Sequence, residues 1–283
     1  MSIYLMFKIN TPYALSAIAL MVILYFYITI KSDNKKGMAT IFQGVIYQIS
    51  RTIQVFLQKT EKEKTVEAWR PAVLCLSKDS FERFGAMEMM KWISYRYGFG
   101  TYIHFEKDYF SKETKKDAQL KLEKLIKSAA TNNNNVFIET LISPSNTAAI
   151  IQAIQQPGMS GQPNNMMLFE YKKGETEWLK TIIDNFSVLK AAKYDLCILA
   201  SSVKGFGYKK DIHIWIRKED YENANLMILL SYIILGHKDW KRAEIKIFAA
   251  VNKETLESEK VYLTELTTTG RLPISANYEL TSS

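Results

Sequence analysis

Cysteine and histidine are scarce in this chain of 283 residues, which contains two cysteines and three histidines. Cys75 and Cys197 lie far apart in the apolar runs AVLCL and LCILA, a setting typical of buried, reduced thiols rather than of a disulfide framework. His104, His213 and His237 are widely separated, and none has a Cys or another His at metal-ligand spacing. The sequence therefore predicts a reducing compartment and no metal site.

Sequence motifs for catalysis and cofactor binding are also missing. There is no dinucleotide or P-loop glycine pattern, no serine in a nucleophile elbow, and no carboxylate pair marked as acid and base. The nearest candidate is SSVKGFG at 201–207, where Ser201, Lys204, Gly205 and Gly207 offer hydroxyl, amine and backbone donors to an anion. A turn into the next strand is the simpler interpretation. We therefore predict no enzyme activity, no catalytic residue and no cofactor, with nucleotide binding near Lys204 as the alternative.

The charge distribution gives little support to a nucleic-acid partner. The net charge is +8, but lysine and arginine are spread along the chain and interleaved with aspartate and glutamate. Apolar residues make up 47% and charged residues 23% of the chain, so the averages indicate neither disorder nor a protein of many membrane helices. An anionic membrane surface remains compatible with the positive charge, and we predict that nucleic acid is not a partner.

One charge-free segment stands apart from this average. Residues 9–30, between Lys8 and Lys31, carry no charge and as a helix would extend about 33 Å, enough to cross a bilayer. The segment is too long for a signal peptide and lacks a small-residue cleavage site, and buried helices of soluble proteins are usually shorter. We therefore predict a transmembrane helix within 1–31.

The orientation of this predicted helix follows from the charges after it. Three lysines and one aspartate in KSDNKKG at 31–37 favour a cytoplasmic location for everything that follows. A single span cannot enclose a path for a polar solute, because such a path needs several helices around it. The predicted location is thus the cell membrane, with the C-terminal domain in the cytoplasm and no transport by this chain alone.

A connecting region at 32–65 contains a second helical pattern. From Met38 to Leu57 the apolar residues recur with the three-and-four spacing of one helix face, while glutamines and Arg51 occupy the other face. Such a stripe must be covered by the membrane, by a second subunit or by the chain's own domain, and the sequence does not distinguish these covers. The charged EKEKT at 61–65 is typical of a solvated linker.

The remainder, 66–283, has the pattern of an α/β domain. Short apolar runs alternate with longer helical patterns; the predicted strands are 72–76, 101–105, 135–141, 166–171 and 195–200, and the predicted helices are 82–97, 113–130, 145–155 and 175–192. Continuous apolar strands indicate burial on both faces, and the alternating order predicts a mostly parallel sheet with right-handed crossovers. A further strand, helix and strand follow at 212–218, 221–235 and 243–251.

Three segments carry a resemblance to a known family. The order of apolar segment, amphipathic helix and then AWRPAVLCL at 68–76, with Trp69, Arg70 and Pro71, resembles the end of the cation-chloride cotransporters, the sodium-potassium-chloride and potassium-chloride symporters. The segment GQPNNMMLFEY at 161–171 is similar to the family's approach to a central strand. The stretch 213–251 resembles a further family segment, with matching residues Trp215, Asp220, Leu229, Leu230, His237, Trp240, Ile247 and Phe248.

The resemblance has departures as well as implications. The family's usual His-Asp-Gly-Gly run stands here as KEDYEN at 218–223, and the family's earlier membrane spans, which hold its ion sites, have no counterpart. The resemblance implies a last transmembrane helix plus a cytoplasmic regulatory domain, with a fold similar to the universal stress proteins. It further implies a homodimer formed through that domain and association with the remaining transmembrane helices and the bilayer. The alternative is a membrane-tethered, nucleotide-sensing module of the universal-stress type.

Two expectations about apolar residues complete the prediction. Trp69, Trp215 and Trp240 are expected to fill a core rather than to bind a ligand. The helix at 221–235 is apolar on more than one side, which predicts that the 221–251 region contributes to the dimer contact. The alternative for this helix is that it is sandwiched inside the monomer.

Overall fold

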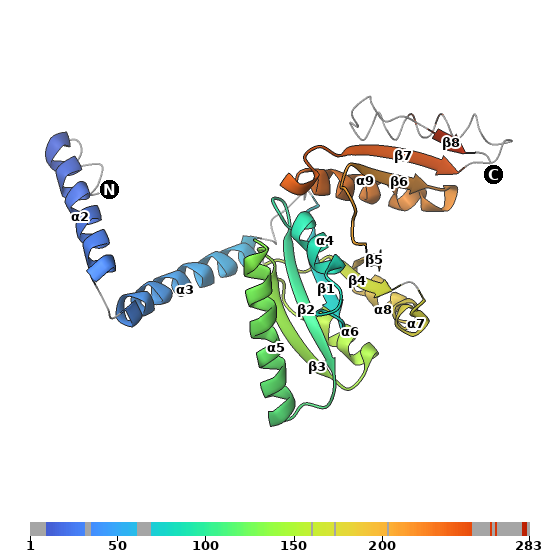
Figure 1. The fold of residues 1–283 in the computed structure, drawn as a ribbon, viewed down its shortest axis with the longest axis horizontal. Helices are drawn as coiled ribbons and strands as arrows, with labels where there is room; N and C mark the ends of the chain where they lie inside the picture. The colour runs from blue at the N-terminus through green and yellow to red at the C-terminus, as the bar shows by residue number, and fades with distance from the viewer. Residues whose placement is uncertain are drawn as a thin grey trace. The chain divides into compact units, whose positions relative to one another are not determined.

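The structure, a computed structural model, describes residues 10–31, 35–60, 69–159, 161–172, 174–202, 204–250, 261, 264 and 279–281. The chain forms two compact units, 1–60 and 61–283, and each is described by itself. Figure 1 shows the helical N-terminal unit and the α/β unit.

The N-terminal unit consists of two helices, α2 (Thr11–Lys31) and α3 (Lys35–Thr60). Both form where the sequence predicted helices. Within the described residues, however, no helix combines the length and the apolarity needed to cross a bilayer, so the transmembrane helix predicted within 1–31 is not confirmed.

Apolar side chains of this unit are exposed. On α2 they include Leu20, Met21 and Ile23, and on α3 they include Ile46 and Phe56, which belong to the predicted stripe. Large exposed apolar surfaces are generally places where proteins contact lipid or other chains.

The first sheet of the α/β unit has five parallel strands in the order β3-β2-β1-β4-β5. These strands are β1 (Ala72–Ser77), β2 (Phe99–Lys107), β3 (Phe137–Ser143), β4 (Met166–Lys172) and β5 (Asp195–Ser201). In the register, Cys75 pairs with Tyr102 on one side and with Leu168 on the other. This arrangement confirms the predicted α/β class, and the strand order reverses between β1 and β4.

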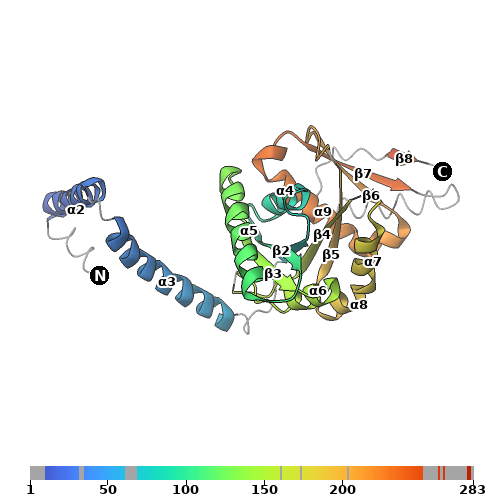
Figure 2. The same ribbon diagram turned by 60° about the horizontal axis from the view of Figure 1, so that its bottom comes forward.

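Helices cover both faces of this sheet (Figure 2). They are α4 (Gly85–Ile93) and α5 (Lys112–Thr131) against one face, and α6 (Asn146–Ile154), α7 (Thr176–Asp184) and α8 (Phe186–Ala191) against the other. The single helix predicted at 175–192 is divided at Asn185, whose buried amide donates hydrogen bonds to Thr147 Oγ1 at 3.2 Å and to the Thr181 carbonyl at 2.8 Å. This side-chain bonding competes with the helix backbone and ends α7.

The three inner strands, β2, β1 and β4, confirm the predicted burial on both faces. Every residue of β1 is buried, and β4 is buried from Met166 to Glu170. The prediction is wrong for β5, where Ile198 and Ala200 are exposed and the other residues are partly exposed, because the strand order places it at the edge of the sheet. Cys75 in β1 and Cys197 in β5 are free thiols, as predicted, and burial raises the pKa of Cys197 to about 11.

A second, smaller sheet has three parallel strands in the order β6-β7-β8. They are β6 (Asp211–Ile216), β7 (Glu244–Ala250) and the unpredicted β8 (Glu279–Thr281). The connection from β6 to β7 contains the turn η2 (Lys218–Asp220), helix α9 (Tyr221–Leu235) and the turn η3 (Lys238–Trp240).

Helix α9 lies between two cores of the α/β unit. Ala224 and Ile228 pack with Ile247 of the second sheet, whereas Ile233 and Ile234 join the cluster that covers the α4 face of the first sheet. Both apolar sides of α9 are therefore buried within the α/β unit, which agrees with the alternative prediction that this helix is sandwiched inside the monomer. All three clusters consist of residues of the α/β unit, so this unit contains its own cores.

Candidate functional site

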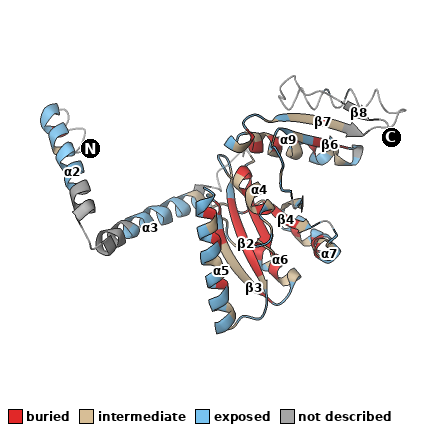
Figure 3. Ribbon diagram, in the orientation of Figure 1, coloured by how far each residue is buried: buried red, intermediate tan, exposed pale blue. Residues whose placement is uncertain are grey.

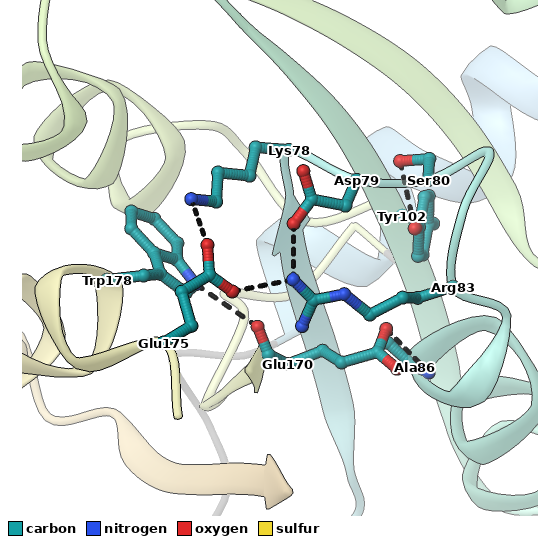
Figure 4. Close-up of polar contacts among 9 residues, drawn as sticks. All are labelled: Lys78, Asp79, Ser80, Arg83, Ala86, Tyr102, Glu170, Glu175 and Trp178. Carbon is teal, nitrogen blue, oxygen red and sulfur yellow. Dashed lines mark hydrogen bonds and ion pairs between the residues drawn. The ribbon is translucent and has the colours of Figure 1, made fainter. Parts of the chain in front are cut away.

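A cluster of charged side chains lies where the strand order reverses, between the carboxyl ends of β1 and β4. Lys78, Asp79 and Arg83 follow β1, while Glu170 lies in β4 and Glu175 just after it (Figure 4). In open parallel sheets, ligands bind in the crevice outside the carboxyl ends of strands at such a reversal. A ligand site in this fold class is therefore expected at this edge.

Four of the five charged side chains in this cluster are paired with one another. The Nη2 of Arg83 lies 2.6 Å from Asp79 Oδ2 and 2.6 Å from Glu175 Oε2, and Lys78 Nζ lies 2.5 Å from Glu175 Oε1. Partial burial would raise the pKa of the Glu175 carboxyl, but hydrogen bonds from Lys78 and Arg83 outweigh it and hold that pKa below its ordinary value. Two cations and two carboxylates thus neutralise each other.

Glu170 occupies the amino end of α4. Its side chain is 5% exposed, and Oε2 accepts a hydrogen bond from the Ala86 backbone N–H at 3.1 Å. Gly85 permits this approach, since a Cβ at this position would lie 2.6 Å from Glu170 Oε1. Helix amino ends favour anions, so the chain's own carboxylate takes the place that a phosphate occupies in many nucleotide-binding folds.

Beside this cluster is a cavity of about 660 Å³ at the carboxyl ends of β4 and β5. The loop residues singled out from the sequence, Ser201, Lys204, Gly205 and Gly207, do line it, together with Arg83. Gly205 and Gly207 have φ values of +62° and +60°, which turn the loop at a low steric cost.

The charges lining the cavity are mixed. Lys172, Lys204 and Lys209 face it with Arg83, but so do the carboxylates of Glu82, Glu88 and Glu170. These carboxylates disfavour a polyanionic ligand in the part of the cavity next to α4.

A hydrogen-bonded network with the residue types of a catalytic triad lies near the carboxyl end of β1 and is here called the Ser80 network. His104 Nδ1 is 2.8 Å from Ser80 Oγ, and His104 Nε2 is 2.7 Å from Glu106 Oε1. Tyr102 donates its hydroxyl proton to Ser80 Oγ at 2.9 Å. Lys121 extends the network, with Nζ at 2.7 Å from Glu106 Oε1.

The Ser80 network is closed to substrate. Ser80 is 1% exposed, and its oxygen already accepts the Tyr102 hydrogen bond. Burial lowers the pKa of His104 despite the opposing effect of Glu106, so the imidazole is neutral near pH 7 and can accept the Ser80 proton while donating to Glu106. The arrangement satisfies buried polar groups and presents no reactive oxygen to solvent.

Neither the Ser80 network nor the contact between Glu170 and the Ala86 N–H was predicted from the sequence. His104 was considered only for metal binding, although Tyr102, His104 and Glu106 alternate along β2 and so share one face of the strand. That alternation was a usable signal, whereas the approach of Ser80 from the next loop was not. Among the residues that the structure describes, no group of three or more His, Cys, Asp or Glu side chains is arranged to hold a metal ion.

The three predicted tryptophan anchors differ. Trp240 is buried and Trp69 packs against the same cluster, as predicted. The prediction is wrong for Trp215, which is 51% exposed and stacks on Phe248 with ring centroids 4.6 Å apart. Along β6 the alternate residues Ile214 and Ile216 face α9, so Trp215 lies on the opposite face of the second sheet.

Comparison with known proteins bears on the fold. The sequence matches no family model and no curated protein. Among solved structures, the chain is similar to a crystal structure of the cytoplasmic domain of a prokaryotic cation chloride cotransporter, with 15% sequence identity and a TM-score of 0.54. The similarity covers 76% of this chain and 79% of that one. The two proteins share a fold. At this identity the likeness concerns the fold alone.

Proposed function

We propose that the α/β unit is the C-terminal regulatory domain of a cation-chloride-cotransporter-like secondary active symporter, and that this chain transports nothing alone. The observation that carries the proposal is the fold shared with a cotransporter's cytoplasmic domain over three quarters of the chain. At the sheet's carboxyl edge, Lys78 and Arg83 are paired with Glu175, and the hydrogen-bonded network around Ser80 is buried. These features suit a domain that acts through contacts rather than catalysis.

The proposal is tested by transport in the cells that make this protein. Removing residues 69–283 should reduce chloride-dependent uptake of rubidium, a tracer for potassium, and restoring the full chain should return it. Uptake that is unchanged by the removal would contradict a regulatory role in such a symporter.

We further propose that the N-terminal unit attaches this domain to the membrane, with the remaining transmembrane helices of the symporter covering α2 and α3. The proposal rests on the uncharged stretch 9–30, the lysines that follow it and the exposed apolar residues of both helices. The chain should stay with membranes after alkaline extraction, and a reporter fused after Ser283 should be active in the cytoplasm. Release at alkaline pH would oppose attachment.

Homodimerisation through the α/β unit is part of the proposed function. Because α9 is covered within the chain, the more suitable contact is the face of the second sheet opposite α9, where His213 and Trp215 each contact Phe248. Aromatic residues are enriched in protein interfaces, and twofold pairing is the commonest assembly.

Light scattering on residues 69–283 across a concentration series tests the dimer. The wild-type mass should rise to that of a dimer, and Trp215→Asp should keep it monomeric. The matched control is Tyr109→Asp, which places the same charge at another exposed aromatic residue and should leave the dimer intact. A wild-type unit that stays monomeric at high micromolar concentration would overturn self-association.

Nucleotide sensing is the second candidate, favoured by the cavity that Ser201, Lys204, Gly205 and Gly207 line at the strand-order reversal. Calorimetric titration of residues 69–283 with ATP distinguishes the two candidates. Heat of binding that is lost in Lys204→Ala would support nucleotide sensing. We expect no such heat, since the Glu170 carboxylate occupies the helix end next to the cavity.

A further inference from the structure

Two loops rich in basic residues meet at the amino ends of β6 and β7. These loops, 208–210 and 238–242, lie together because the strands are parallel neighbours, and the Glu244 N–H donates to the Lys210 carbonyl at 2.9 Å. They surround a hollow of about 610 Å³, here called the basic hollow, lined by Tyr208, Lys209, Lys210, Asp211, Lys238, Asp239, Lys241, Arg242 and Glu244. It lies outside the charged cluster between β1 and β4.

The basic hollow has an excess of unpaired positive charge. Two of its three acidic residues are engaged elsewhere: Asp239 accepts a hydrogen bond from Trp92 Nε1 at 3.1 Å, and Asp211 pairs with Lys246 at 2.8 Å. The third, Glu244, is exposed, so the five cations of the hollow outnumber its carboxylates. Four of its cations have no ion pair with another residue that the structure describes, namely Lys210, Lys238, Lys241 and Arg242. The surface therefore presents a positive field to a partner.

Lys209 anchors the first loop. Its φ is +53°, a left-handed conformation that is uncommon for a residue with a side chain, and its Nζ lies 4.8 Å from the ring centroid of buried Trp92. The same Nζ lies 4.0 Å from Asp239 Oδ2. With Lys209 turned inward, its neighbours Tyr208, which is 93% exposed, and Lys210 extend into solvent.

The composition of the basic hollow favours a lipid surface over a protein. Lysine is depleted in protein interfaces, but four of the five cations here are lysines. Clusters of four to eight Lys or Arg residues bind anionic lipids at the cytoplasmic surface, and an exposed tyrosine beside them suits the headgroup layer. We propose that the basic hollow binds the anionic headgroups of the membrane. This inference rests on the proposed function, which puts the α/β unit beside the membrane.

Vesicle binding tests the inference on residues 69–283, which contain their own cores and lack the N-terminal helices. The unit should float with phosphatidylcholine vesicles that contain about 30% phosphatidylserine and not with pure phosphatidylcholine. Replacing the exposed Lys238, Lys241 and Arg242 with glutamine should lower binding to the anionic vesicles by about 100-fold. The matched control replaces the exposed Lys112, Lys115 and Lys116 of α5 with glutamine, removes the same charge, and should lower binding far less.

The outcomes separate this inference from the proposed function. Equal loss in both triple variants, or no binding to anionic vesicles, would overturn the basic hollow as a lipid site. Tighter binding to an acidic polypeptide such as polyglutamate, lost in the Lys238, Lys241 and Arg242 variant, would overturn it in favour of a protein partner. Neither result bears on the proposed symporter function, which the rubidium uptake experiment tests separately.

Discussion

The two sheets of the α/β unit differ in how completely they are covered (Figure 3). Helices enclose β1 and β4 on both faces, and these strands are apolar from Ala72 to Leu76 and from Met166 to Phe169. In the second sheet α9 covers one face, and β6 alternates between buried isoleucines and exposed residues that include Trp215. Among the described residues, helices therefore enclose both faces of the first sheet, whereas a helix covers only one face of the second.

The largest expected effect on stability comes from a substitution in the core of the first sheet. Trp178 is 1% exposed, packs against Phe169 and donates from Nε1 to the Glu170 carbonyl at 3.1 Å. Trp178→Ala should lower the free energy of unfolding of the α/β unit by about 3 to 5 kcal/mol, because it leaves a large cavity. Urea denaturation measures it, and a loss below about 1 kcal/mol would contradict the assigned core.

Adding a side chain at Gly85, where α4 approaches Glu170, should have the next largest effect on stability. Gly85→Ala places a Cβ 2.6 Å from Glu170 Oε1 and should destabilise the unit by about 1 to 3 kcal/mol. In a double-mutant cycle, Glu170→Ala should remove most of the additional cost of Gly85→Ala. Strict additivity would show that the carboxylate is not the group that excludes a side chain at Gly85.

A pH-dependent effect is expected at the charged cluster. The folded-state pKa of Glu175 lies below the ordinary value of about 4.5, so this carboxylate contributes stability above that pH and the contribution is lost as the pH falls through the lowered pKa. Between about pH 6 and about pH 3, the wild type should lose more stability than Glu175→Gln. Parallel pH profiles from thermal unfolding of the two proteins would contradict the ion pairs.

The smallest effect on stability should come from a substitution in the second sheet. Trp215→Ala removes a half-exposed ring and should change the free energy of unfolding of the monomer by less than about 1 kcal/mol. The measurement is urea denaturation at a concentration where the wild type is monomeric. A loss as large as that from Trp178→Ala would show that the second sheet is a closed core, ending the contrast between the two sheets.

Much of the fold was predictable from local patterns. The five strands of the first sheet and helix α9 lie close to their predicted ranges, because burial on both faces requires continuous apolar runs and helices require their own spacing. The division at Asn185 and the exposure of β5 were not predictable, since one depends on a contact with Thr147 and the other on strand order.

The candidate sites were less predictable than the fold. The loop 201–207 could be identified by its residue types, and the structure places it at a cavity. The Glu170 carboxylate that meets Ala86 is 84 residues away in the chain, and the basic hollow unites loops on either side of α9. Only parallel pairing brings such segments together, and no local spacing encodes it.

The sequence by itself determined the α/β class, the two free thiols, the amphipathic character of α3 and the apolar strands, because each follows from residue type and period. The tertiary structure alone decided that α9 is sandwiched, that Trp215 is exposed, and that the Glu170 carboxylate meets the end of α4. These outcomes depend on which distant elements pack together, and burial of a side chain is a property of that packing rather than of the residue.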